Sequence, residues 1–135
     1  MSDLRVSEAL WRLTDCGETA IDIGANIGYM TRLLAFRVGR QGRVLAFEPQ
    51  PKLVNILTEN VDAWRCETGA TIEVHPLALS DHEGEALLGI PDDFDQNHGL
   101  THLVSAGDDS PKTRIPVRIK RLDNIIEEKI GNPEN

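Results

Sequence analysis

Two acidic residues and one glycine-containing segment are the parts of this chain whose residue types and spacing could do chemistry. The segment reads Asp22-Ile-Gly24-Ala-Asn26-Ile-Gly28, and a second acid, Glu48, lies 20 residues after its last glycine. Glycine adopts backbone torsion angles that are costly for other residues, and it lets a ligand approach the main chain closely. A carboxylate placed like Glu48 can accept hydrogen bonds from the hydroxyls of a ribose. The pattern therefore predicts a site for a nucleoside ligand.

The segment differs from the dinucleotide-binding fingerprint G-x-G-x-x-G at two positions. Asn26 stands where the second glycine should be, and Tyr29 stands where the third should be. The second glycine brings a pyrophosphate onto the backbone, so its loss argues against NAD. A ligand without phosphates fits better, because the carboxylate of Asp22 can accept hydrogen bonds from amides or bind a cationic group. Gly28 is expected to let the following helix pack close to the strand.

A purely structural interpretation of the same residues is the alternative. Gly24 and Gly28 would then serve only a tight turn between strand and helix, and Asp22 would cap the helix. Glu48 would be an exposed acid at the end of a strand. Under the functional interpretation too, its carboxylate is expected to contribute little to folding, because it lies at a strand end.

Hydrophobic spacing predicts the elements that would position these residues. Helices are expected at 4–13, 27–38, 51–64 and 122–130, and strands at 19–24, 43–48, 71–75, 85–90 and 114–119. The first six elements alternate helix and strand, which is typical of the first half of a doubly wound parallel α/β sheet. Ligands bind such sheets at the carboxyl ends of the strands, where both acids are expected.

We expect one domain across residues 1–135. It would consist of a leading helix at 1–17, a cofactor-binding core at 19–78 and, after one more strand, a polar loop at 91–113. That loop is too long for an ordinary connection, which predicts a functional or mobile segment.

Composition restricts the class of partner. Fourteen Lys and Arg against 22 Asp and Glu give a net charge of -8, which excludes a generally basic surface of the kind that binds nucleic acid. No apolar stretch approaches the roughly 20 residues that cross a bilayer, and the N-terminus lacks a signal-peptide pattern. Cys16 and Cys66 form no metal or disulfide pattern, so a cytoplasmic protein is expected.

Short motifs, in order along the chain, carry a resemblance to one known family. The most specific are Asp22-Ile-Gly-Ala-Asn-Ile-Gly-Tyr29 and Ala46-Phe-Glu-Pro49. Weaker pieces follow, which are Ala78-Leu-Ser-Asp81 with Gly84, Asn97-x-Gly99, Leu122-Asp123 and Ile125-Ile126. Together they resemble the FkbM-like family of S-adenosylmethionine-dependent methyltransferases, from about Thr19 to Ile126.

The resemblance implies a class I methyltransferase fold, which is a Rossmann-like three-layer α/β fold, with S-adenosylmethionine as the cofactor. It also implies that Glu48 holds the ribose diol and that Ala78 lies beside the adenine. The residues implied around the methionine part and sulfonium are Asp22, Gly24, Ala25, Asn26 and Gly28. Family members are typically O-methyltransferases, so the expected substrate is a hydroxyl of a sugar, a small molecule or a natural product. No residue is assigned as the catalytic base.

The family continues beyond the final helix into a strand with the motif K-x-D-x-E-G, whereas this chain ends at Asn135. The fold is therefore expected to be truncated after its first half plus a β-hairpin-like insertion, with the first strand at an open edge. Self-association or a second chain would cover that edge. A non-catalytic binding module that retains a partial cofactor pocket is accordingly an alternative function.

An RNA methyltransferase is a further alternative, because a short basic run occurs late in the chain. The run consists of Arg114, Arg118, Lys120 and Arg121. The acidic net charge and the lack of interleaved aromatic residues disfavour nucleic acid as a partner.

The polar loop contains residues that could bind a metal or remove a proton. Asp93-x-Asp95-x-Asn97 begins like a calcium loop, but the glycine and the twelfth position do not match that loop, so no metal is expected. His98 and His102 could act as a base toward a substrate hydroxyl, although solvent-exposed loop histidines are the more common case.

Overall fold

The computed structural model describes residues 4–90, 102–103 and 113–129. These residues belong to two compact units, Met1–Pro76 and Leu77–Asn135, and each unit is described by itself.

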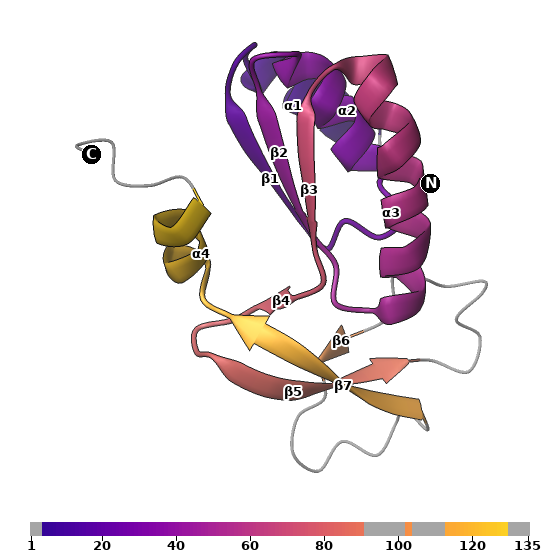
Figure 1. The fold of residues 1–135 in the computed structure, drawn as a ribbon, viewed down its shortest axis with the longest axis vertical. Helices are drawn as coiled ribbons and strands as arrows, with labels where there is room; N and C mark the ends of the chain where they lie inside the picture. The colour runs from indigo at the N-terminus through magenta and orange to yellow at the C-terminus, as the bar shows by residue number, and fades with distance from the viewer. Residues whose placement is uncertain (1–3, 91–101, 104–112, 130–135) are drawn as a thin grey trace. The chain divides into compact units, whose positions relative to one another are not determined.

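The first unit alternates helices and strands around a parallel sheet (Figure 1). Its elements are α1 (Leu4–Leu13), β1 (Thr19–Ile23), α2 (Tyr29–Val38), β2 (Arg43–Phe47), α3 (Pro51–Thr68) and β3 (Thr71–His75). The strand order is β1-β2-β3, and both pairings are parallel. The predicted α/β class is confirmed, and the six predicted elements occur close to their expected bounds.

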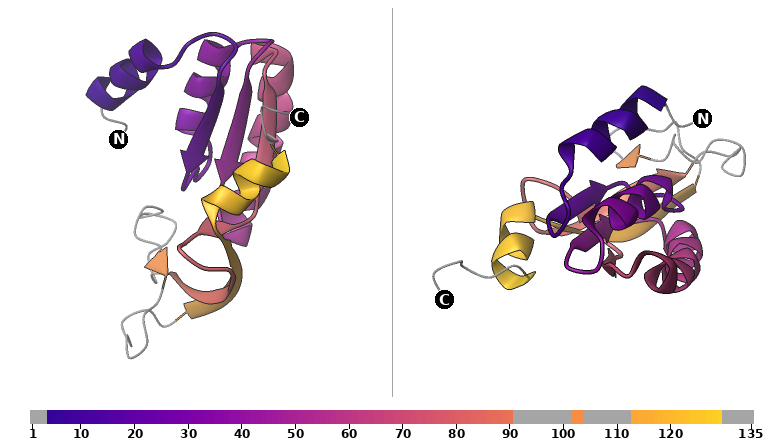
Figure 2. Two further views of the ribbon diagram at one scale, coloured as in Figure 1. Left: turned by 90° about the vertical axis from the view of Figure 1, so that its left-hand side faces the viewer. Right: turned by 90° about the horizontal axis from the view of Figure 1, so that it is seen from above.

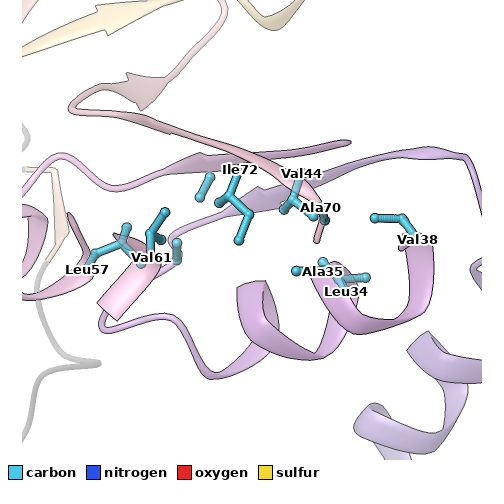
Figure 3. Packing of buried hydrophobic residues seen from close by; sticks show 10 residues of the cluster. Leu34, Ala35, Val38, Val44, Leu57, Val61, Ala70 and Ile72 are labelled. Carbon is cyan, nitrogen blue, oxygen red and sulfur yellow. The ribbon is translucent and has the colours of Figure 1, made fainter. Parts of the chain in front are cut away.

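One face of this sheet is covered by α2 and α3, which lie behind the strands in the left view of Figure 2. Branched and small side chains of both helices meet alternate residues of the strands (Figure 3). The buried cluster includes Leu34, Ala35 and Val38 of α2, Leu57 and Val61 of α3, Val44 and Ala46 of β2, and Ile72 of β3. This packing fixes where the carboxyl ends of β1 and β2 lie.

The first helix, α1, buries none of its residues completely. Leu10 packs against the cluster of the first unit. Arg37 of α2 holds the end of α1, because its Nε donates to the carbonyl oxygen of Thr14 at 2.6 Å and its guanidinium lies 5.2 Å from the Trp11 ring centroid. None of the described helices combines the length and the apolar character needed to cross a membrane.

β1 lies at one edge of the three-stranded sheet. It pairs with β2 from Thr19 opposite Arg43 to Ile23 opposite Phe47. Among the described strands, no other strand pairs with β1. The predicted edge position of the first strand is therefore present in the described part of the chain.

The second unit contains a mixed sheet with strand order β4-β7-β5-β6. Its elements are β4 (Ala78–Leu79), β5 (Gly84–Ile90), β6 (His102–Leu103), β7 (Thr113–Lys120) and α4 (Leu122–Lys129). The antiparallel pairing of β5 with β7 confirms the predicted β-hairpin-like insertion. β4 was not expected, because two residues are too few to show an alternating pattern, and it pairs in parallel with β7.

Gly28 makes room for α3, which differs from the expected close packing against the strand. Its φ is +103°, a conformation that side chains rarely adopt. A Cβ atom placed there would lie 2.6 Å from Cζ3 of Trp64 and 2.8 Å from Cδ1 of Leu57. Both neighbours are side chains of α3, so glycine is needed for the helix packing as well as for the turn.

We expect Gly28→Ala to lower the free energy of unfolding by more than about 2 kcal/mol. Backbone strain costs about 1–3 kcal/mol, and overpacking against Trp64 and Leu57 adds about 1–3 kcal/mol. Gly17→Ala is the matched control, because Gly17 has a φ of +84° but a Cβ there meets nothing within 4 Å. Urea unfolding of the two variants should show the larger loss for Gly28→Ala, and equal losses would contradict the packing role.

Candidate functional site

The carboxylate of Glu48 is buried at the carboxyl end of β2, with only 6% of the residue exposed. Its Oε1 accepts a hydrogen bond from the backbone N–H of Asn26 at 2.9 Å, and its Oε2 accepts one from the backbone N–H of Gln50 at 2.9 Å. The backbone N–H of Glu48 donates to the carbonyl oxygen of His75 at 3.1 Å, which continues the pairing with β3. Each carboxylate oxygen therefore accepts one hydrogen bond from the protein, and each has the capacity to accept another.

The burial of Glu48 revises the expectation that this residue contributes little to folding. Removing its carboxylate would leave the N–H groups of Asn26 and Gln50 without their acceptor. A buried donor that loses its partner costs about 1–3 kcal/mol. A truncation such as Glu48→Ala would therefore change folding and ligand binding together.

Asp22 forms the second acidic group of the site, near the end of β1. Its Oδ2 accepts a hydrogen bond from the hydroxyl of Thr31 at 2.6 Å. Thr31 lies in the first turn of α2 and is completely buried. The hydroxyl fixes one oxygen of Asp22, so the carboxylate is oriented by the helix that follows the loop.

The loop between β1 and α2 is fastened to β2 and α3 by hydrogen bonds. The backbone N–H groups of Gly24 and Ala25 both donate to the carbonyl oxygen of Phe47 at 2.9 Å. The side-chain amide of Asn60 donates to the carbonyl oxygen of Ile27 at 2.8 Å. Gly24 is exposed, and a Cβ built on it would meet nothing within 4 Å, so space is open in front of the backbone.

Both carboxylates are held in an environment that disfavours their charge. Burial raises the pKa of Asp22 above 3.8, and the Thr31 hydroxyl partly opposes this shift. Burial also raises the pKa of Glu48 above 4.5; the amides of Gln50 and Asn26 lower it, and the charge of Asp22 raises it further. No ion pair among the described residues involves either acid. The site is therefore suited to a cationic ligand.

Six of the seven sequence-predicted site residues lie together at the carboxyl edge of β1 and β2. They are Asp22, Gly24, Ala25, Asn26, Gly28 and Glu48. Ala78 is in β4 of the second unit, which is described separately.

Two residues that orient the acids were missed by sequence reasoning. Gln50 supplies a backbone N–H to Glu48, and its side chain also caps α3 by accepting from the N–H groups of Lys52 and Leu53. Thr31 supplies the hydroxyl to Asp22. A polar residue directly before Pro51 was a signal for the cap, and a lone hydroxyl in the first turn after the loop was a weaker signal for Thr31.

His75 and His82 are the histidines whose side chains the structure describes. The ring of His75 stacks on Phe47 with centroids 5.0 Å apart. Nδ1 of His82 lies 2.8 Å from Oδ1 of the exposed Asp81 in the second unit. His98, the calcium-like segment at 93–97 and the side chain of His102 lie outside the described residues.

The chain matches one protein family and is similar to several known proteins. Residues 22–134 match the Methyltransferase FkbM domain family. The chain is 37% identical over 76 residues to a protein-L-isoaspartate O-methyltransferase of Triticum aestivum, covering 56% of this chain and 31% of the relative. It is 40% identical over 45 residues to a protein of the same name from Caenorhabditis elegans, covering 33% of this chain and 20% of the relative.

The matched part of the chain thus spans less than a third of the length of either relative. A solved structure described as a SAM-dependent O-methyltransferase from Thermotoga maritima is similar with a TM-score of 0.47 and 17% identity, over 71% of this chain and 48% of that chain. The family match includes both acids and the loop between β1 and α2, and it extends over most of the chain. This chain belongs to the FkbM methyltransferase family.

Proposed function

We propose that this chain binds S-adenosylmethionine at the carboxyl edge of β1 and β2 and methylates a hydroxyl of a sugar, a small molecule or a natural product. The observation that carries the proposal is the carboxylate of Glu48, which is buried and oriented by two backbone amides. Membership of the FkbM family supports methyl transfer. The names of the two relatives, both O-methyltransferases, support oxygen as the acceptor atom.

The two oxygens of Glu48 fit the two hydroxyls of a ribose. Oε1 and Oε2 each accept one hydrogen bond from the protein, so both can accept a second one from outside. A vicinal diol presents two O–H donors side by side, which suits the paired oxygens of a carboxylate. Because the side chain of Glu48 is already held in one orientation, it would lose little conformational entropy when a sugar binds.

The acids also suit the charge of this cofactor. S-adenosylmethionine carries a sulfonium and an ammonium group, and it carries no phosphate. Asp22 and Glu48 interact unfavourably with one another when both are ionised, so a nearby cation would stabilise the pair. A phosphate-bearing dinucleotide would add negative charge to the same place.

The role of these residues in the reaction is to bind and orient. When bound, S-adenosylmethionine would supply an electrophilic methyl group to a substrate oxygen, with S-adenosylhomocysteine and the hydroxyl proton as the other products. Glu48 and the loop at 24–28 would fix the sugar and the amino-acid part, and this alignment is the main contribution that such a site makes to the rate.

A non-catalytic binding module is the second candidate function, and the position of β1 at the sheet edge favours it. An edge strand offers backbone donors and acceptors to a strand of another chain. The two candidates differ in turnover. A methyltransferase would convert the cofactor to S-adenosylhomocysteine in the presence of an acceptor, whereas a binding module would bind the cofactor and leave it unchanged.

We expect the wild-type chain to prefer S-adenosylhomocysteine to its 2′-deoxyribose counterpart by about tenfold or more, because a hydrogen bond to a charged group contributes about 1.5–3 kcal/mol. In Glu48→Gln the preference should fall below about threefold, since one charged acceptor is lost. Titration calorimetry measures both ligands on both proteins, and the ratio cancels any effect on folding.

Glu59→Gln is the matched control, because Glu59 is an exposed acid of α3. Its diol preference should equal that of the wild type. A wild-type chain that binds both ligands equally would remove Glu48 from the sugar site, and tighter binding of NAD would overturn the choice of cofactor.

The raised pKa values of Asp22 and Glu48 predict how affinity depends on pH. The cationic cofactor binds the ionised acids, so affinity should be highest at neutral pH. On acidification the affinity should begin to fall at a higher pH than the ordinary pKa values of Asp and Glu, 3.8 and 4.5, would predict. In the ligand-free protein the sign is opposite, because ionising a group with a raised pKa removes folding stability as the pH rises.

Calorimetry across the pH range tests this dependence, with thermal melts of the ligand-free chain beside it. Asp22→Asn should bind more weakly at neutral pH and lose less affinity on acidification than the wild type. It should also lose less stability as the pH rises. An identical pH profile for the wild type and Asp22→Asn would exclude Asp22 from the site.

A further inference from the structure

The backbone of Asn26 has a conformation that is unusual for a residue with a side chain. Its φ is 58°, and it is the one described non-glycine residue with a positive φ. Asn26 lies within a tight turn over residues 25–28, because the N–H of Gly28 donates to the carbonyl oxygen of Ala25 at 2.9 Å. Asn26 is therefore the first central residue of a tight turn, a position where a positive φ favours Gly, Asn and Asp.

Three consecutive N–H groups in and before this turn donate to acceptors at the end of β2. Those of Gly24 and Ala25 donate to the carbonyl oxygen of Phe47, and that of Asn26 donates to Oε1 of Glu48. The chain must reverse directly after the third donor, because α2 begins at Tyr29. The left-handed conformation of Asn26 achieves this reversal while its N–H stays on the carboxylate.

The side chain of Asn26 has no comparable role in the described structure. Its Oδ1 is buried without a hydrogen-bond partner, and no side-chain hydrogen bond of Asn26 is formed with a described residue. A buried acceptor without a donor carries a desolvation cost. The contribution of this residue that the described structure shows is therefore its left-handed backbone, whose N–H is bonded to Glu48.

We propose that Asn26 is a positioning residue that acts through its backbone: its left-handed conformation holds Oε1 of Glu48 in the orientation that selects a ribose diol. The inference rests on the proposed nucleoside site. It differs from the expectation that Asn26 contacts the methionine part, because a contact residue would need its side chain and a positioning residue needs only its φ.

A series at position 26 separates these roles. Asn26→Gly keeps the positive φ and removes the whole side chain, Asn26→Ala keeps only Cβ, and Asn26→Val places a branched chain of similar size where φ is positive. We expect Asn26→Gly to retain the affinity for S-adenosylhomocysteine and the diol preference of the wild type. Asn26→Ala should weaken affinity, and Asn26→Val should weaken it about fivefold to thirtyfold, since left-handed torsions penalise side chains in that order.

The diol preference distinguishes positioning from a general structural effect. In Asn26→Val, the preference for S-adenosylhomocysteine over its 2′-deoxyribose counterpart should fall toward one, because Glu48 is no longer held. A merely structural loss would weaken both ligands equally and leave the ratio unchanged, which would overturn the proposal. A loss in Asn26→Gly as large as that in Asn26→Val would overturn it too, because it would show that the side chain is the contact.

A measurement on the ligand-free protein keeps this test separate from the proposed function. An N–H that donates to a carboxylate changes its NMR chemical shift when that carboxylate titrates. The amide proton of residue 26 should follow the ionisation of Glu48 in the wild type and in Asn26→Gly, and it should not do so in Asn26→Val. If the wild type binds no nucleoside, the proposed function fails, and this titration alone then confirms or refutes the positioning of Glu48.

Discussion

The hydrogen bonds from two backbone amides to the carboxylate of Glu48 are the interaction on which the rest of the site depends. One amide comes from the loop after β1 and the other from the residue that caps α3. The side chain of Glu48 therefore joins its own loop to the loop after β1, where its partner Asn26 lies 22 residues earlier in sequence. Under the proposed function, the main chain fixes the orientation of this acid before a ligand binds, and such preorganisation would lower the entropy cost of binding.

The elements of the first unit were predictable because their physical causes are local. Helical spacing in Leu34, Val38, Leu57 and Val61 marks the faces that bury themselves against the sheet, and short apolar runs mark the parallel strands. The loop at 24–28 was predictable for the same reason, since glycine directly after a strand indicates a tight turn. The two-residue β4 was not predictable, because its pairing with β7 depends on a partner distant in sequence.

The site residues were only partly predictable, because residue type does not show which atoms meet. The structure places Glu48 beside the loop that follows β1, but the amides of Asn26 and Gln50 that hold its carboxylate could not be read from residue types. Gly28 was expected to allow close packing, but its nearest neighbour, Trp64 of α3, could not be identified from the sequence. Backbone N–H groups are present in almost every residue, so the sequence does not show which of them donate to Glu48. These donors could be found only in the structure.

The free-energy cost of ionising the two buried acids links the stability of the fold to ligand binding. Burial raises the pKa of Asp22 and Glu48, so keeping both ionised at neutral pH costs folding free energy. The Thr31 hydroxyl and the two amides offset part of this cost, and the described residues offer no cation to offset the rest. A ligand that carries positive charge and a diol would supply both missing interactions. Its binding would therefore stabilise the chain at the carboxyl ends of β1 and β2.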